Sequence, residues 1–146
     1  MSGPALTQFD SHHAIHQAAF AEAERLTYLL RKMVGEESER EAAEVADILV
    51  EHWETRTLRH AEAEEEGLYR DVVHARPDRA QFVERLQRDH DLLRQLLLEI
   101  RQILAHDGWR YGVAERFEAM LLLNGIHSRD EEAFLFPSAM PVKLGR

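Results

Sequence analysis

A ten-residue pattern occurs twice in this chain, once from His60 to Tyr69 and once from His127 to Phe136. In both copies a histidine is followed four and five positions later by glutamates, and then by a leucine and an aromatic residue. Residues four positions apart lie on one face of an α-helix, about one turn from each other. The pattern therefore predicts two helices, each of which presents an imidazole and a carboxylate side by side.

The rest of the chain also has helical spacing. Ala, Leu, Glu, Arg and Gln dominate the sequence, and apolar residues recur every three or four positions. The predicted helices run from about Asp10 to Val34, from Ser38 to before Pro77, from Asp78 to His106 and from about Tyr111 to Phe136. The second is unusually long, and Gly67 or the segment from Thr55 to Thr57 is where it is expected to bend. Because the connections are short, the predicted fold is all-α, an up-down-up-down antiparallel four-helix bundle.

Length and charge limit the domain organisation and the partners. A chain of 146 residues with 45% apolar content has the size of one domain. We expect a single domain over residues 1–146, in which residues 1–9 form a loose N-terminal arm and residues 138–146 a C-terminal tail. The net charge of -9, with 18 basic residues scattered among 27 acidic ones, disfavours nucleic acid and anionic membranes as partners. Neither a long apolar run nor a signal pattern is present, which predicts a cytoplasmic protein.

Cysteine is absent from the sequence, whereas histidine occurs nine times. Disulfides, thiolate-bound zinc, cysteine-bound iron-sulfur clusters and thiol catalysis are therefore excluded. Any metal site in this chain must use nitrogen and oxygen ligands.

The two repeated pairs, His60 with Glu64 and His127 with Glu131, lie within the apolar stripes of their helices. In a bundle they would face each other across the core, where two buried carboxylates are costly unless cations compensate their charge. Two metal ions bridged by both carboxylates would supply that compensation. On the third predicted helix, His90 lies among leucines and adds another interior imidazole.

The first predicted helix carries His12, His13 and His16. At about 100° per residue, His12 and His16 share the direction of the apolar face, whereas His13 points aside and is expected to face solvent. His60 lies 22 residues after Ser38, and His12 and His13 lie about as many residues before Gly35. These two histidines are therefore expected at the same height along the bundle as His60. Direction and level agree only for His12, and His16, one turn away, is the natural fifth nitrogen.

The candidate metal ligands are His12, His16, His60, Glu64, His90, His127 and Glu131. If two six-coordinate metals share both carboxylates and one oxygen bridge, the five imidazoles leave one position open on one metal. Imidazoles with carboxylates suit iron or manganese and also accept zinc, which usually prefers four ligands. Glu65 and Glu132 turn about 100° away from the paired ligands, so they are expected to face water or to orient a ligand.

These residues resemble the hemerythrin-like family, also called the hemerythrin HHE cation-binding domain, over residues 9–137. The resemblance implies a four-helix bundle with one histidine on the first helix, a His-x-x-x-Glu pair on the second, a histidine on the third and a second pair on the fourth. It assigns these positions to His12, to His60 with Glu64, to His90, and to His127 with Glu131. It also implies a non-haem di-iron centre, so the expected cofactor is two iron ions.

Two departures separate this chain from the oxygen-carrying hemerythrins. Arg94 stands where their third helix has a second histidine, and the last pair is His-x-x-x-Glu rather than His-x-x-x-x-Asp. The pattern is closer to the bacterial hemerythrin-like and iron-responsive branches. The resemblance thus implies a protein that binds or senses dioxygen, iron or a related small oxidant.

Two alternatives remain at this point. An open iron site can also degrade peroxide, as a catalase does, or oxidise iron, and a positive charge from Arg94 beside the site would favour peroxide. The other alternative is a structural bundle whose His-x-x-x-Glu pairs are ordinary helix salt bridges. The binding or sensing protein and the enzyme both imply a small-molecule partner, dioxygen or peroxide, whereas the structural bundle predicts no bound metal.

Overall fold

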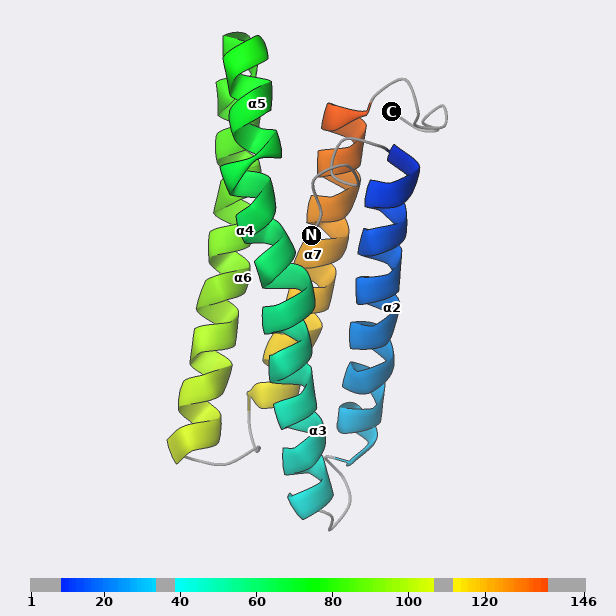
Figure 1. Ribbon diagram of the computed structural model, residues 1–146. Helices are drawn as coiled ribbons and strands as arrows, with labels where there is room; N and C mark the ends of the chain where they lie inside the picture. The colour runs from blue at the N-terminus through cyan, green and yellow to red at the C-terminus, as the bar shows by residue number, and fades with distance from the viewer. Residues whose placement is uncertain (1–8, 34–38, 107–111, 137–146) are drawn as a thin grey trace, which may run out of the picture.

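The computed structural model describes residues 9–33, 39–106 and 112–136, and these residues are almost entirely helical (Figure 1). They contain no strand, so the predicted all-α class is confirmed for this part of the chain. The predicted N-terminal arm, apart from Phe9, and the predicted C-terminal tail lie outside the described residues, as does Gly35. The elements are α2 (Phe9–Met33), α3 (Glu39–His52), η1 (Trp53–Leu58), α4 (Arg59–Glu66), α5 (Leu68–Ala75), η2 (Pro77–Arg79), α6 (Ala80–His106) and α7 (Val113–Leu135).

The long second predicted helix is a composite of α3, η1, α4 and α5, which follow one another along the chain. Its α-helical pattern is interrupted at the two places that the sequence indicates. From Trp53 to Leu58 the backbone forms a wider π-helix, and at Gly67 it departs from helical angles, with φ -117° and ψ -85°. Such interruptions let one rod bend around a core that a straight helix would leave.

The remaining two helices begin close to their predicted positions. A short 3₁₀ turn, Pro77–Arg79, precedes α6. Gly112, at φ +89°, precedes α7, and its backbone N–H donates to Glu115 Oε1 at 3.1 Å. Because left-handed backbone is unfavourable for residues with a Cβ atom, the glycine fixes where α7 starts.

The described residues form four helical rods: α2, the composite of α3, η1, α4 and α5, then α6, and last α7. The apolar faces of these four rods meet in one main core. Helix α2 packs against α3 and α7, and α6 packs against α7. The fully buried side chains of this core include Leu30, Leu49, Trp53, Leu93, Ile100, Phe117 and Met120. In α2 and in α6 these residues lie in the second half of the helix. In α7 and in the composite of α3 to α5 they lie in the first half.

A smaller apolar cluster lies toward the opposite ends of these rods. Its buried members are Tyr69, Val83 and Leu86, and Phe134 and Leu135 pack against them. Along each of the second, third and fourth rods, the candidate ligands come between the residues of the main core and those of this smaller cluster. The polar site therefore occupies a layer between two apolar regions.

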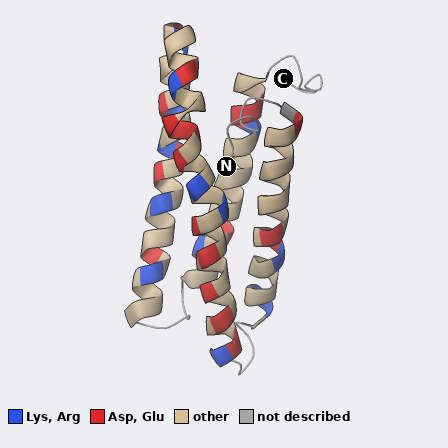
Figure 2. Ribbon diagram, in the orientation of Figure 1, with Lys and Arg blue, Asp and Glu red and all other residues tan. Residues whose placement is uncertain are grey.

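Charged residues lie outside the main core. Figure 2 shows acidic residues interspersed with basic ones along the helices rather than separate basic and acidic faces. None of the described helices combines the length and apolar character needed to cross a membrane.

Candidate metal centre

The structure brings all seven candidate ligands together in the interior. His12, Glu64, His90, His127 and Glu131 are each at most 2% exposed, and the side chains of His16 and His60 are 10% exposed. They come from four separate rods. Their burial agrees with the sequence pattern, which places them on the apolar face of each helix.

The ligand atoms form two overlapping groups, within each of which all atoms lie within 4.8 Å of one another. One group is His12, His16, His60 and Glu64, and the other is Glu64, His90, His127 and Glu131. Each group can hold a metal ion, and Glu64 belongs to both.

Glu64 divides its two carboxylate oxygens between the groups. Its Oε2 lies 2.8 Å from His12 Nε2 and 3.2 Å from His60 Nε2. Its Oε1 lies 3.4 Å from His90 Nε2. The carboxylate thus faces different histidines with each oxygen.

Glu131 is divided in the same way. Its Oε1 lies 3.2 Å from Nε2 of both His12 and His16, whereas its Oε2 lies 3.5 Å from His127 Nε2. Each carboxylate therefore faces histidines of α2 or α4 with one oxygen and histidines of α6 or α7 with the other. This is the arrangement of carboxylates that can bridge two cations.

Three histidines are oriented by a carboxylate from another helix. Their Nδ1 atoms lie 2.7 to 3.1 Å from a carboxylate oxygen, in the pairs His90 with Glu65, His127 with Asp89 and His16 with Glu132. A carboxylate at Nδ1 favours the tautomer that carries its proton there. The Nε2 atoms are then left with lone pairs directed into the site.

His90 and His127 show why a cation suits this centre. Their Nε2 atoms lie 3.1 Å apart while both Nδ1 atoms face carboxylates. Two lone pairs at that distance repel, so a proton or a metal ion must lie between them. Burial lowers the pKa of His127, but Asp89 and Glu131 outweigh burial and raise it to about 10, which puts the proton there in the metal-free protein.

The other charges of the site follow the same balance. Burial lowers the pKa of His12, but Glu131 and Glu64 outweigh it and raise the pKa to about 9. Burial raises the pKa of Glu64, yet the surrounding imidazoles hold it well below its ordinary value. In the metal-free protein, protons on the imidazoles therefore stabilise the buried carboxylates.

Several atoms at the site lack hydrogen bonds despite their burial. Among the described residues, His12 Nδ1, His60 Nε2 and Glu131 Oε1 have no hydrogen-bond partner. Yet His60 Nε2 lies 3.2 Å from Glu64 Oε2, and Glu131 Oε1 lies 3.2 Å from His16 Nε2. These contacts have the distance but not the direction of a hydrogen bond. Ligands bound at roughly 2.0–2.2 Å to one ion lie about 3 Å apart when they are adjacent. The spacing and the donor set thus fit a metal ion.

Glu65 and Glu132, which were expected to face water or to orient ligands, do the latter. Glu132 is 5% exposed and accepts from His16 and from His13, whose Nδ1 lies 2.9 Å from Glu132 Oε1. The side chain of His13 is 44% exposed, in agreement with its predicted outward direction. Glu65 holds His90.

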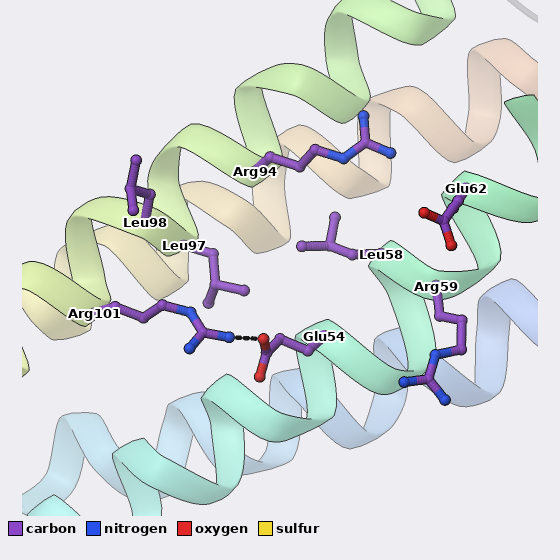
Figure 3. A pocket seen from close by; sticks show the side chains of 8 residues that line it. All are labelled: Glu54, Leu58, Arg59, Glu62, Arg94, Leu97, Leu98 and Arg101. Carbon is purple, nitrogen blue, oxygen red and sulfur yellow. Dashed lines mark ion pairs between the residues drawn. The ribbon is translucent and has the colours of Figure 1, made fainter.

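Arg94 lies in an open groove between the second rod and α6 (Figure 3). Its guanidinium donates to both oxygens of Glu65, at 3.1 and 3.0 Å, and to Asp91 at 3.0 Å. Because Glu65 in turn holds His90, Arg94 acts on the site through Glu65. Its charge is paired there rather than presented to a ligand at the histidines.

Two residues that contact the candidate ligands were not predicted from the sequence. Asp89 holds His127, and the Tyr69 hydroxyl donates to Glu131 Oε2. Burial and the charges of Glu131 and Glu64 raise the pKa of Tyr69, so its phenol stays protonated. Tyr69 is the aromatic residue of the first repeat, which was the available signal, whereas nothing in helical spacing singles out Asp89.

The chain matches no protein-family model, no curated protein and no solved structure. The geometry of the site is therefore the basis for assigning a function to the chain.

Proposed function

We propose that this chain is a hemerythrin-like protein whose bundle core holds two metal ions bridged by Glu64 and Glu131. The observation that carries this proposal is the division of both buried carboxylates between two sets of histidines. In this assignment His12, His16 and His60 bind one ion, and His90 and His127 bind the other. An ordinary helix salt bridge needs no such division, since it pairs one acid with one base.

We further propose that the bundle has up-down-up-down antiparallel connectivity. In Figure 1 the colours run in alternating directions along successive rods, which supports this arrangement. Such connectivity lets four helices contribute ligands at one level of the bundle.

The proposed metal is iron. Five imidazoles with two carboxylates suit iron or manganese better than zinc, which usually takes four ligands. The first ion has three histidines and the second has two, so the second keeps the open position. When bound, a redox metal with an open position supplies reversible binding or reduction of dioxygen or a related oxidant.

The chain's own residues would prepare this chemistry. The carboxylates of Glu65, Asp89 and Glu132 hold three imidazoles in the orientation that directs Nε2 inward. Burial of the site excludes bulk water. The proposed function is accordingly to bind or sense dioxygen, iron or a related small oxidant, with dioxygen or peroxide as the small-molecule partner.

A second candidate is an enzyme that degrades peroxide or oxidises iron. The observation that favours it is the hydroxyl of Tyr69 in contact with Glu131, because a buried hydrogen-bond donor beside the site can stabilise negative charge that develops on peroxide. The binding protein and the enzyme would use the same residues. The binding protein would release its small molecule chemically unchanged, whereas the enzyme would convert it.

The test begins with the metal content of protein produced with iron, for which we expect about two ions per chain. A content below one would refute the di-metal centre. The His127→Ala variant should lose iron, whereas His74→Ala, at an exposed position outside the site, should retain it. Absorption spectra of the reduced protein after addition of air or peroxide then separate the candidates. A stable oxygen adduct supports binding, and rapid gas evolution from peroxide supports the enzyme.

A further inference from the structure

A small cavity lies beside the candidate ligands, on the side of the site nearer the main core. One wall consists of Glu64 and the histidines at positions 16, 60, 90 and 127, and the other walls are Ile15, Ala19, Thr57 and Asn124. Its volume is about 20 Å³, whereas one water molecule needs roughly 10–15 Å³. The cavity therefore has room for one very small molecule in contact with the site.

Asn124 is the unexplained residue of this cavity. It lies on α7, three positions before His127, and it is only 7% exposed. None of the hydrogen bonds among the described residues involves its side-chain amide. The amide atoms are not among the fully buried atoms that lack a partner, so they border accessible space, which here includes the cavity. A buried polar group that lines a cavity without a protein partner points to a partner inside the cavity.

The other walls indicate which kind of partner this is. Ile15 and Ala19 are apolar, and Thr57, from the π-helix η1, is the other polar wall outside the candidate ligands. Glu64 is an acceptor, and the Nδ1 protons of His90 and His127 are directed to Glu65 and Asp89. His60 also lines the cavity, but its Nε2 lies 3.2 Å from Glu64 Oε2 and is assigned to the first metal ion. The amide of Asn124 is thus an N–H donor at this cavity that does not belong to a candidate ligand.

We propose that the Asn124 amide donates a hydrogen bond to a small ligand in this cavity, and that the ligand is a di- or triatomic acceptor such as dioxygen, peroxide or azide. The inference rests on the proposed function and adds a specificity-determining residue to it. The hydrogen bond favours ligands that carry negative charge on the atom nearest Asn124. The small volume excludes larger organic molecules.

The alternative is that Asn124 merely fills a polar gap in the packing. A packing role depends on the shape of the side chain, which leucine and aspartate approximate. A donor role depends on the N–H group, which both replacements remove. Substitution by both therefore separates the two roles.

The experiment uses the full chain loaded with iron and azide as the probe, with affinity measured by absorption titration. We expect Asn124→Leu to weaken azide binding by about 10- to 100-fold, the effect of losing a hydrogen bond to a charged ligand. Asn124→Asp, which retains the shape but presents an acceptor, should weaken it at least as much. The antisymmetric stretching frequency of bound azide should also shift, because its hydrogen bond is lost. Gln102→Leu, which removes an exposed amide on α6, is the matched control and should bind azide normally.

Metal content distinguishes the possible failures. If the unaltered protein binds less than one iron, the proposed function fails. If iron content is retained and both Asn124 variants bind azide within about twofold of the unaltered protein, with an unchanged stretching frequency, the donor role of Asn124 is overturned while the metal centre stands. Should Asn124→Leu not fold, Asn124→Ala, which also removes the N–H group and adds no charge, decides the question.

Discussion

Glu64 is the residue shared by both groups of candidate ligands, and it is 1% exposed. In place of water, its carboxylate contacts imidazoles of two other rods, α2 and α6, and one imidazole of its own rod. A buried carboxylate with such surroundings is stable only while the neighbouring positive charges are present. Protons or metal ions can supply these charges, so Glu64 connects stability to metal binding.

Glu64→Gln should therefore reduce the iron content of both positions together. The amide retains the size of the side chain but removes the negative charge that both ions share. We expect iron to fall from about two ions per chain to below one. Metal analysis of purified protein is the measurement, and Glu62→Gln, at an exposed position on the same helix, is the control. Loss of only one ion would contradict the shared role.

Tyr69 offers a second test at this scale. Tyr69→Phe removes the hydroxyl that donates to Glu131 and leaves the ring stacked on His90 at 5.6 Å. Since hydrogen bonds to charged groups contribute about 1.5–3 kcal/mol, we expect a loss of that order in the free energy of unfolding of the metal-free protein. Urea denaturation measures it. Tyr28→Phe, at a position 66% exposed, should change the stability very little, and equal effects of the two substitutions would contradict the proposed contact.

At the scale of the helices, α7 depends on two glycines in opposite ways. Gly112 has φ +89° and precedes the helix, whereas Gly125 lies within it. A Cβ atom at Gly112 would meet the Arg116 side chain and would strain the backbone. A Cβ atom at Gly125 would lie 3.6 Å from Phe20, which is ordinary contact.

Gly112→Ala should accordingly lower the free energy of unfolding by about 1–2 kcal/mol, the cost of left-handed backbone. Gly125→Ala should raise it by up to about 1 kcal/mol, because alanine favours helix more than glycine does. Urea denaturation of both variants provides an internal comparison. A free energy of unfolding that Gly112→Ala leaves unchanged or raises would show that the start of α7 is not fixed by Gly112.

The helices were predictable because they depend on local spacing. The apolar stripes correctly predicted the helical rods and the gathering of the seven candidate ligands. The spacing did not predict the π-helix, since an added residue per turn changes the period that the prediction assumes. It only marked the segment Thr55 to Thr57 as a place where the rod bends.

Contacts between different rods were less predictable. Helical spacing tells which residues share a face of one helix, but not which residue of a neighbouring helix they meet. The roles of Asp89 and Tyr69 were not predicted for this reason. Glu65 and Glu132 were expected either to face water or to orient a ligand, and the spacing alone could not decide between the two. Their positions depend on how deeply each rod is shifted along its neighbour, which no single segment of sequence records.

For the whole molecule, the charges of the site predict a pH dependence. The pKa values of His12 and His127 are raised from 6.5 to about 9 and about 10. Their contribution to stability is complete below about pH 6.5 and is lost as the pH rises through 9 to 10. The pKa of Glu64 is lowered, so its contribution is lost only as the pH falls below its ordinary value of 4.5.

The metal-free protein should therefore be most stable between about pH 4.5 and 6.5 and should lose stability from there to pH 10. Metal ions compete with the same protons, so the stabilisation gained from added metal should grow over that range. Urea denaturation at several pH values, with chelator or with metal, measures both slopes. A metal-free stability that stays constant between pH 6.5 and 10 would argue against protonated imidazoles in the site.

The polar layer separates the main core from the smaller cluster around Tyr69, Val83 and Leu86. A break in apolar contact is where a protein divides into units that open independently. If the layer binds metal as proposed, we expect the two apolar regions to form one cooperative unit. Without metal, we expect the end built by α5, the start of α6 and the end of α7 to open alone, with its backbone amides exchanging with solvent before those of the main core. Metal loss would thus be visible as a local unfolding of one end, a change that a protease or a binding partner can recognise.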